Sequence, residues 1–274
     1  MREKVFILAL LVVAATAFGQ DWEGDLFQGD VHGTLGAAYD TQFIWRGFNI
    51  YGSRGATHIL GDLNLFDTGF GLSAVGHYAT GSGFTNLTRW DYTAYYQNGI
   101  FGGEPFATNF RLGWVYYNYP GHSSAVQDLQ EGHAIFSWPN ILPIKGLCPS
   151  YVTAYMWPSR SGSYISRRGT GSANGWFHIF MLDYGFTVPG VIPEIPEHVI
   201  KLHGELVYND GFGWDGRNVK SAISHAVLGG STDLWLDPNQ SISLTPSVYY
   251  QISMEDTVNP DNEFWGGLSL KYSF

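Results

Sequence analysis

Three polar side chains at alternate positions, Lys201, His203 and Glu205, are the residues of this sequence whose types and spacing could do chemistry. Residues at positions i, i+2 and i+4 share one face of a β-strand, so an ammonium, an imidazole and a carboxylate would lie in a row. Such a row could be a polar track for a solute. It could also be a salt-bridged structural network, and we favour the network because charges inside a protein wall persist when they are paired.

Other charged residues recur on the polar faces of alternating segments along the chain. These candidates are Asp40, Arg46, Asp62, Arg89, Asp91, Arg111, Glu131, His133 and Lys271. Both signs occur in similar numbers, which indicates either a salt-bridged plug or a water-filled lumen with weak net selectivity. For Arg46 we favour a salt bridge to Asp40 or Asp62 over a contact with substrate. A further hypothesis is that Arg46 and Arg111 line one constriction and set ion selectivity.

Catalysis and metal binding have weak support in the sequence. No G-x-S-x-G motif occurs, and Ser224 and His225 are adjacent, so in a regular strand they would lie on opposite faces and could not act together. The nine histidines form no H-x-H or H-x-x-x-H pair, and no metal site is predicted. Oxygen-rich residues in 209–216 could hold Ca²⁺, but we favour a plain turn. We therefore predict a protein that is not an enzyme and uses no cofactor.

The elements that position these residues are β-strands, because apolar and polar residues alternate along much of the chain. In 241–254, Ile242, Leu244 and Val248 lie on an apolar face, and most residues between them are serine, threonine or glutamine. The final segment alternates in the same way from Phe264 to Phe274. A soluble β-sandwich and a membrane barrel both produce this period of two, so alternation alone does not choose between them.

Three further features favour the membrane barrel. Aromatic rings bracket the apolar faces at the strand ends, as rings do at two membrane interfaces. The clearest examples are Trp90, Tyr96, Phe264, Tyr272 and Phe274. The segments run about 10 to 15 residues, which suits tilted membrane-crossing strands better than the ~5 to 6 residues of soluble sheets. Short and long connections also alternate.

We predict an all-β fold, a closed antiparallel transmembrane β-barrel of twelve strands. The expected strands are 33–48, 55–66, 69–79, 88–98, 105–118, 127–138, 148–157, 174–186, 197–208, 221–236, 240–254 and 263–274. Connections on the side of the termini should be short and periplasmic, and those on the other side longer and external. Two proline-rich links, 139–147 and 189–197, are long for the short side.

Composition and the N-terminal residues agree with an exported membrane barrel. Of the 274 residues, only 14% are charged, 16% are aromatic and 35 are glycine. The formal charge of -10 disfavours nucleic acid as a partner, and the single cysteine, Cys148, excludes an internal disulfide. Residues 1–17 have the basic start, apolar run and A-x-A site of a signal peptide, with cleavage between 17 and 20. A short periplasmic segment, 18–31, would then precede the barrel, 32–274.

Several short motifs resemble those of a known family. Residues 38–47 resemble the first strand of the TorF-type porin family, and residues 224–229 and 244–250 are similar to its last strands. The ending Tyr272–Phe274 is similar to the terminal aromatic-x-Phe signal through which the barrel-insertion machinery recognises outer-membrane proteins. The resemblance implies an outer-membrane barrel without naming a substrate.

The functional expectation is therefore a porin or passive channel for small solutes in the bacterial outer membrane. Its expected partners are outer-membrane lipid and lipopolysaccharide, the insertion machinery and small solutes. Lipopolysaccharide phosphates could be attracted by Arg160, Arg167 and Arg168. Loop charges that are simply solvated are the simpler interpretation of these arginines. Two alternatives remain open. One is a non-conducting structural or adhesin-like outer-membrane barrel, and the other is a secreted soluble β-sandwich that binds a ligand.

Overall fold

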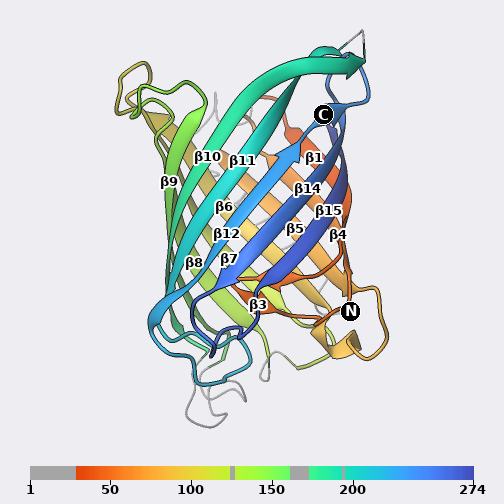
Figure 1. Cartoon of the computed structure of the whole chain (residues 1–274), viewed down its shortest axis with the longest axis vertical. Coiled ribbons are helices and arrows are strands. Elements are labelled where there is room, and N and C mark those ends of the chain that lie inside the picture. Colours follow the sequence, from red (N-terminus) through yellow and green to blue (C-terminus); the bar gives the residue numbers. More distant parts are fainter. Residues whose placement is uncertain (1–28, 124–126, 161–172, 193–194) are drawn as a thin grey trace, which may run out of the picture.

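The alternating segments build one closed wall of antiparallel strands in the computed structural model, which describes residues 29–123, 127–160, 173–192 and 195–274 (Figure 1). The wall strands are β1 (His32–Asp40), β4 (Ala56–Asn64), β5 (Phe70–Ala79), β6 (Arg89–Ile100), β7 (Thr108–Asn118), β8 (Leu129–Ser137), β9 (Leu147–Pro158), β10 (Gly175–Ile192), β11 (Ile195–Asn209), β12 (Ala222–Thr232), β14 (Ile242–Ser253) and β15 (Glu263–Ser273). A short strand, β13 (Leu234–Trp235), continues β12 after an interruption, and both pair with β14.

Closure depends on β1, which pairs with β4 on one side and with the last strand, β15, on the other. Leu35 lies opposite Gly61 and Tyr272, so neither end of the sheet is a free edge. Closure is what permits a sheet to face hydrocarbon, since unpaired backbone groups in lipid cost several kcal/mol each. The predicted closed barrel of twelve strands is confirmed, and the soluble β-sandwich alternative is wrong.

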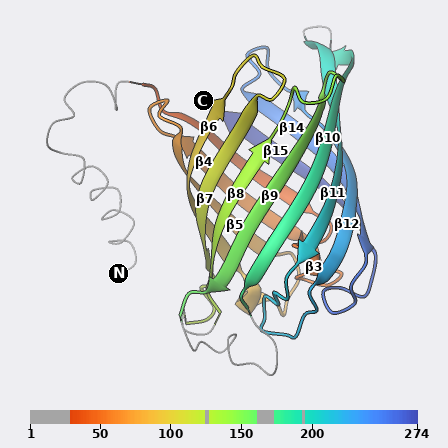
Figure 2. The ribbon, with the colours of Figure 1, turned by 90° about the vertical axis from the view of Figure 1, so that its left-hand side faces the viewer.

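The strands run obliquely around the barrel (Figure 2). Their outer face is apolar. Leu35, Phe180 and Leu228, for example, are each more than half exposed on that face. We call the end that carries the C-terminus the turn end and the opposite end the loop end. Of the predicted interface aromatics, Trp90 and Phe264 lie on strand residues next to the loop end, and Tyr96, Tyr272 and Phe274 lie toward the turn end.

Three predicted boundaries are wrong. The first strand ends at Asp40 instead of residue 48, because the chain leaves the wall there. The supposed long link at 189–197 is mostly strand: Pro189 pairs with Glu197 and a register shift follows, at a position where the missing N–H of proline is tolerated. The tenth strand is divided into β12 and β13 at Asp233. The predicted signal peptide, 1–17, lies outside the described residues, as do residues 18–28.

Within the described residues, no helix is long and apolar enough to cross a membrane. The described part of the chain contains one short 3₁₀ helix, Thr85–Leu87, in a loop-end connection.

The connection between β1 and β4 folds into the lumen, and we call residues 41–55 the inserted hairpin. It contains β2 (Ile44–Trp45) and β3 (Phe48–Asn49), joined by a two-residue turn. Arg46 and Gly47 in that turn have φ values of 53° and 87°. Two-residue hairpin turns of type I′ need positive φ at both central residues, and their twist then matches that of the flanking strands. Gly47 meets this requirement easily, whereas Arg46 adopts a conformation that is costly for a residue with a Cβ.

The buried core of the protein lies inside the loop end of the barrel, around the inserted hairpin. Phe48 and Tyr51 are 1% and 0% exposed. Phe48 contacts the ring of Phe212 from a loop-end connection, with centroids 6.3 Å apart, and Phe212 contacts Phe177 of β10 at 5.3 Å. The loop end is therefore packed like a protein interior, while the polar faces of the strands continue toward the turn end.

Candidate functional site

A buried ion pair joins the turn of the inserted hairpin to the wall. Nη2 of Arg46 donates to both carboxylate oxygens of Glu131 on β8, at 3.0 and 2.9 Å. Tyr117 donates its hydroxyl to the same carboxylate at 2.7 Å, and Nδ1 of His133 lies 3.0 Å from it. Glu131 is 2% exposed, so each of its oxygens is satisfied in a dry environment.

The expected salt bridge of Arg46 to Asp40 or Asp62 is wrong. It assumed that Arg46 extends the first wall strand, but the hairpin carries it across the lumen to β8. Burial by itself would lower the pKa of Arg46; the negative charge of Glu131 outweighs it, so the pKa is raised and the guanidinium stays charged. Removing either partner would leave an uncompensated buried charge.

Further hydrogen bonds tie the hairpin to three other wall strands and to one loop-end connection. Nε2 of Gln251 donates to the Gly47 carbonyl at 3.0 Å, and Nδ2 of Asn49 donates to Glu263 at 2.9 Å. The Tyr51 hydroxyl lies 3.1 Å from the carbonyls of His77 and Leu87, and burial raises the pKa of this phenol. The hairpin is thus held at its turn, its second strand and its return to the wall.

Asp40 and Asp91, two predicted lumen residues, belong to one chain of polar contacts beside the hairpin. Asp40 lies 3.1 Å from Nε2 of His58, His58 lies 2.8 Å from His77, and His77 lies 3.1 Å from Asp91. Asp91 also accepts two hydrogen bonds from Arg89, at 2.7 and 2.9 Å. The structure therefore brings these residues together as a structural network.

The guanidinium of Arg89 lies over a hairpin ring. Its central carbon is 4.1 Å from the centroid of Trp45, a cation–π distance. Arg89 is 2% exposed and fixed by Asp91, so it supports the hairpin from the wall side.

Asp62 and Arg111 occupy a different part of the lumen, toward the turn end. Asp62 accepts a hydrogen bond from Tyr95 at 2.9 Å, and Arg111 lies 4.1 Å over the same ring while donating to Gln97 at 2.6 Å. Arg111 lines a cavity of about 670 Å³, whereas Arg46 lines a second cavity of about 200 Å³ at the hairpin. The two arginines therefore do not share one constriction, contrary to the hypothesis from sequence.

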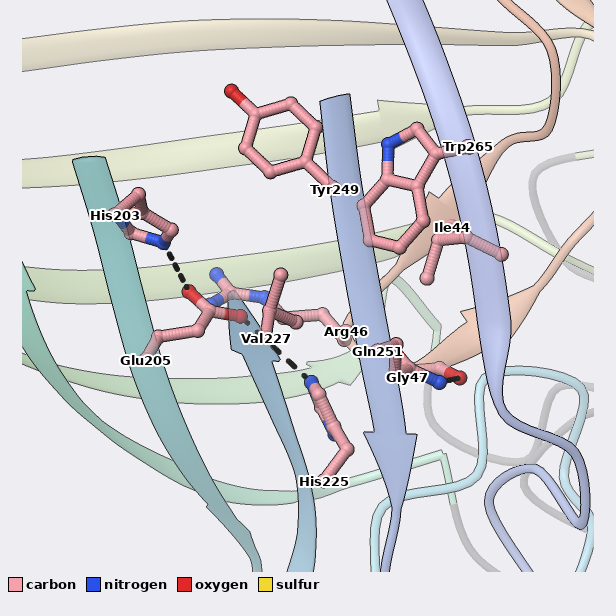
Figure 3. A pocket seen from close by; sticks show the side chains of 10 residues that line it. All are labelled: Ile44, Arg46, Gly47, His203, Glu205, His225, Val227, Tyr249, Gln251 and Trp265. Atoms are coloured by element: carbon pink, nitrogen blue, oxygen red, sulfur yellow. Dashed lines mark hydrogen bonds and ion pairs between the residues drawn. The ribbon is translucent and has the colours of Figure 1, made fainter. Parts of the chain in front are cut away.

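The cavity beside the hairpin, which we call the loop-end cavity, collects residues from five elements (Figure 3). Its lining consists of Ile44, Arg46, Gly47, His203, Glu205, His225, Val227, Tyr249, Gln251 and Trp265. The side chains of His203 and Glu205 are 25% and 22% exposed, so solvent reaches them. The cavity therefore combines buried and hydrated polar groups.

The row Lys201, His203 and Glu205 shares the inner face of β11, and each member has a partner outside β11. Nζ of Lys201 lies 2.6 Å from Asp233. His203 lies 2.7 Å from Asp183 through Nδ1 and 3.5 Å from Glu205 through Nε2. These contacts favour the network interpretation over an unobstructed polar track.

Ser224 and His225 correct another expectation, because they do touch. A register shift where β11 meets β12 places both side chains inward, with the Ser224 Oγ 2.9 Å from the Nδ1 of His225. Ser224 also donates to the Val207 carbonyl at 3.2 Å, and it is 1% exposed. Ser224 is therefore buried and hydrogen-bonded to the backbone, and its contact with His225 results from the irregular pairing of the two strands.

Sequence reasoning missed Tyr249, Gln251, Trp265 and His225 as cavity residues. A signal for two of them was present, since Tyr249 and Trp265 are aromatic residues on otherwise polar strand faces. In the described ranges, no three His, Cys, Asp or Glu side chains are grouped to hold a metal ion. The oxygen-rich segment after Asn209 is a turn in which Phe212 donates to the Asn209 side chain at 2.7 Å. Arg167 and Arg168 lie outside the described residues.

Two solved porins share this architecture. The KdgM porin aligns with a TM-score of 0.53 and 12% identity, covering 88% of this chain and 99% of that one. The NanC porin aligns with a TM-score of 0.54 and 8% identity, covering 88% and 98%. The fold is a porin-like barrel. No family model and no curated protein sequence matches the chain, so the resemblance to the TorF-type family stays a prediction.

Proposed function

We propose that the protein is an outer-membrane channel that passes small polar solutes, with the inserted hairpin narrowing its loop end. The observation that carries this proposal is the two-faced wall, which is apolar outside and charged inside. Charged residues at membrane depth are tolerated where they pair or face a water-filled space, and partly exposed His203 and Glu205 fit both conditions.

The unequal connections support one orientation of the barrel in the membrane. The loop end carries longer segments, such as 41–55 and 210–221, and the turn end carries shorter ones, such as 65–69. Long external loops and short periplasmic turns are the pattern of bacterial barrels, so the loop end would face outward. The chain ending at Phe274 would then present its terminal aromatic residues on the periplasmic side, where insertion begins.

A non-conducting structural barrel is the second candidate, and the packed loop end is the observation in its favour. Phe48, Tyr51 and Phe212 fill the space that an open channel would leave free. The two candidates differ in whether a solute crosses the barrel. An enzymatic function has less support, because Ser224 is only 1% exposed and its hydroxyl donates to a backbone carbonyl.

Liposome swelling separates the two candidates. Purified protein is reconstituted into liposomes, and swelling is followed in arabinose, glucose and raffinose, together with the Arg46→Ala variant that frees the hairpin turn. A channel predicts swelling that is fastest for arabinose and slowest for raffinose, and faster in Arg46→Ala than in the wild type. If neither protein swells faster than empty liposomes, the barrel does not conduct.

A further inference from the structure

The loop-end cavity contains an aromatic platform. Tyr249 and Trp265 are directly opposed on β14 and β15, with ring centroids 5.3 Å apart and planes 23° from parallel. On the other side of Tyr249, β12 places Gly229 opposite it. A Cβ on Gly229 would lie 2.1 Å from Cδ1 of Tyr249, so the ring lies directly over the glycine. The missing side chain at Gly229 thus makes room for a ring that lies along the inner wall.

Polar groups with unused hydrogen-bonding capacity face the same cavity (Figure 3). The Glu205 carboxylate has imidazole nitrogens of His203 and His225 at 3.5 and 3.9 Å, at or beyond the limit of a hydrogen bond. Gln251 is 0% exposed, and its Oε1 has no hydrogen-bond partner among the described residues, although its Nε2 is bound to Gly47. A buried acceptor without a donor, at the edge of a cavity, indicates a place where a ligand hydroxyl fits.

The charges around the cavity favour a neutral ligand. Arg46 is neutralised by its two hydrogen bonds to Glu131, and Glu205 lies between two histidines. An anionic ligand would meet the Glu205 carboxylate, and a cationic ligand would meet the Arg46 guanidinium. A ligand with both hydroxyl donors and acceptors and no net charge satisfies both sides.

The size of the cavity restricts the ligand further. Its volume of about 200 Å³ is below the roughly 300–1,000 Å³ of sites for drug-sized molecules, so it suits a single small ring. A pyranose has the required combination of an apolar C–H face and a rim of hydroxyl groups.

We propose that the loop-end cavity binds one neutral pyranose ring, with its C–H face against Tyr249 and Trp265 and its hydroxyls donating to Glu205 and to Oε1 of Gln251. This proposal rests on the proposed function, because a sugar would reach the site through the lumen. It also names the class of solute that the channel would pass. Binding itself does not require conduction, so the two proposals fail separately.

Saturation-transfer NMR on the full-length protein in detergent tests the site. The probes are methyl α-D-glucopyranoside, methyl β-D-galactopyranoside, D-galacturonate and choline. We expect transfer from the wild type to the ring C–H protons of at least one neutral glycoside, and at least a severalfold weaker signal for galacturonate and choline. Trp265→Leu and Glu205→Gln should each reduce the signal severalfold. The matched control is Tyr95→Leu, which removes a lumenal ring that lies over Gly71 at the turn end; it should leave the signal unchanged.

Three outcomes would overturn the sugar site: no transfer to either neutral glycoside, stronger transfer to galacturonate or choline, or an unchanged signal in both cavity variants. Folding of each variant is verified by its band shift on unheated electrophoresis, and Glu205→Gln, which is isosteric, serves if Trp265→Leu does not fold. Binding without liposome swelling would keep the site and refute the channel. Swelling without binding would keep the channel and refute the site.

Discussion

At the scale of single residues, alternation predicted which side chains point inward but not what they touch. Asp40, Asp62, Asp91, Arg111 and Glu131 all have partners inside the barrel, as a period of two requires. Their partners depend on tertiary structure, because strands distant in sequence and an inserted segment supply them. Arg46 illustrates the limit, since the sequence indicated a salt bridge to Asp40 or Asp62, whereas the hairpin brings it to Glu131.

Gly229 provides a test at this scale. In Gly229→Ala the new Cβ would lie 2.1 Å from the Tyr249 ring, whereas in the neighbouring Gly230→Ala the nearest atom would be 3.7 Å away. Overpacking of this kind costs about 1–3 kcal/mol. We expect Gly229→Ala to lower the temperature at which the folded band disappears on electrophoresis by several degrees, and Gly230→Ala to change it much less. Equal losses in the two variants would show that Tyr249 is not held against the wall.

At the scale of elements, strands were predictable and departures from regular pairing were not. The segment Phe43–Trp45 breaks alternation with three consecutive apolar residues, which is a visible sign that the first strand has ended. Nothing in that pattern says that the chain then turns into the lumen. The register shift at Ser224 is similar, because one extra residue reverses the facing of its neighbours and leaves no mark in the sequence pattern.

Packing of the inserted hairpin is tested by Phe48→Ala. Phe48 is 1% exposed, and truncating a buried phenylalanine costs about 3–5 kcal/mol. The hairpin should loosen, and trypsin should cleave after Arg46, whose side chain is only 17% exposed in the folded protein. Phe106→Ala is the control, because Phe106 is 53% exposed at the turn end. Protection of Arg46 that is identical in both variants would contradict the described packing.

The turn before β14 should respond to pH. The carboxylate of Asp237 accepts hydrogen bonds from the backbone N–H of Ile242, at 2.6 Å, and of Asn239, at 3.1 Å, and these bonds lower its pKa. Because the folded pKa is depressed, the contribution of the carboxylate is present above the usual pKa of an aspartate and is lost as pH falls through the lowered value. Hydrogen exchange of the Ile242 amide, corrected for intrinsic rates, should therefore accelerate at acidic pH. In Asp237→Asn this acceleration should vanish. An equal acceleration in the variant would show that another titrating group causes it.

At the scale of the whole molecule, the number of strands and the closure of the barrel were predictable from the alternating pattern of each segment. Apolar faces on every strand need hydrocarbon, and a sheet in hydrocarbon must close. The contents of the lumen did not follow, because a charged interior is compatible with both an open pore and a plug. The aromatic core around Phe48 and Phe212 narrows the lumen at the loop end, and no pattern in the sequence indicated it.

A closed barrel should also be visible in electrophoresis. Continuous hydrogen bonding from β1 to β15 predicts a compact form that resists detergent and migrates faster before boiling than after it. Protein that runs at one position with and without boiling, and that remains soluble in buffer without detergent, would argue against a membrane barrel.

Single-channel recording in planar bilayers tests most directly whether the barrel is a channel narrowed by its hairpin. Wild-type protein should give small stepwise conductances, and Arg46→Ala, which removes the contact with Glu131, should give steps several times larger. Arg160→Ala, which removes an exposed arginine just after β9 at the loop end, should match the wild type. The absence of steps from wild type and Arg46→Ala alike, in preparations with a normal band shift, would contradict a conducting lumen.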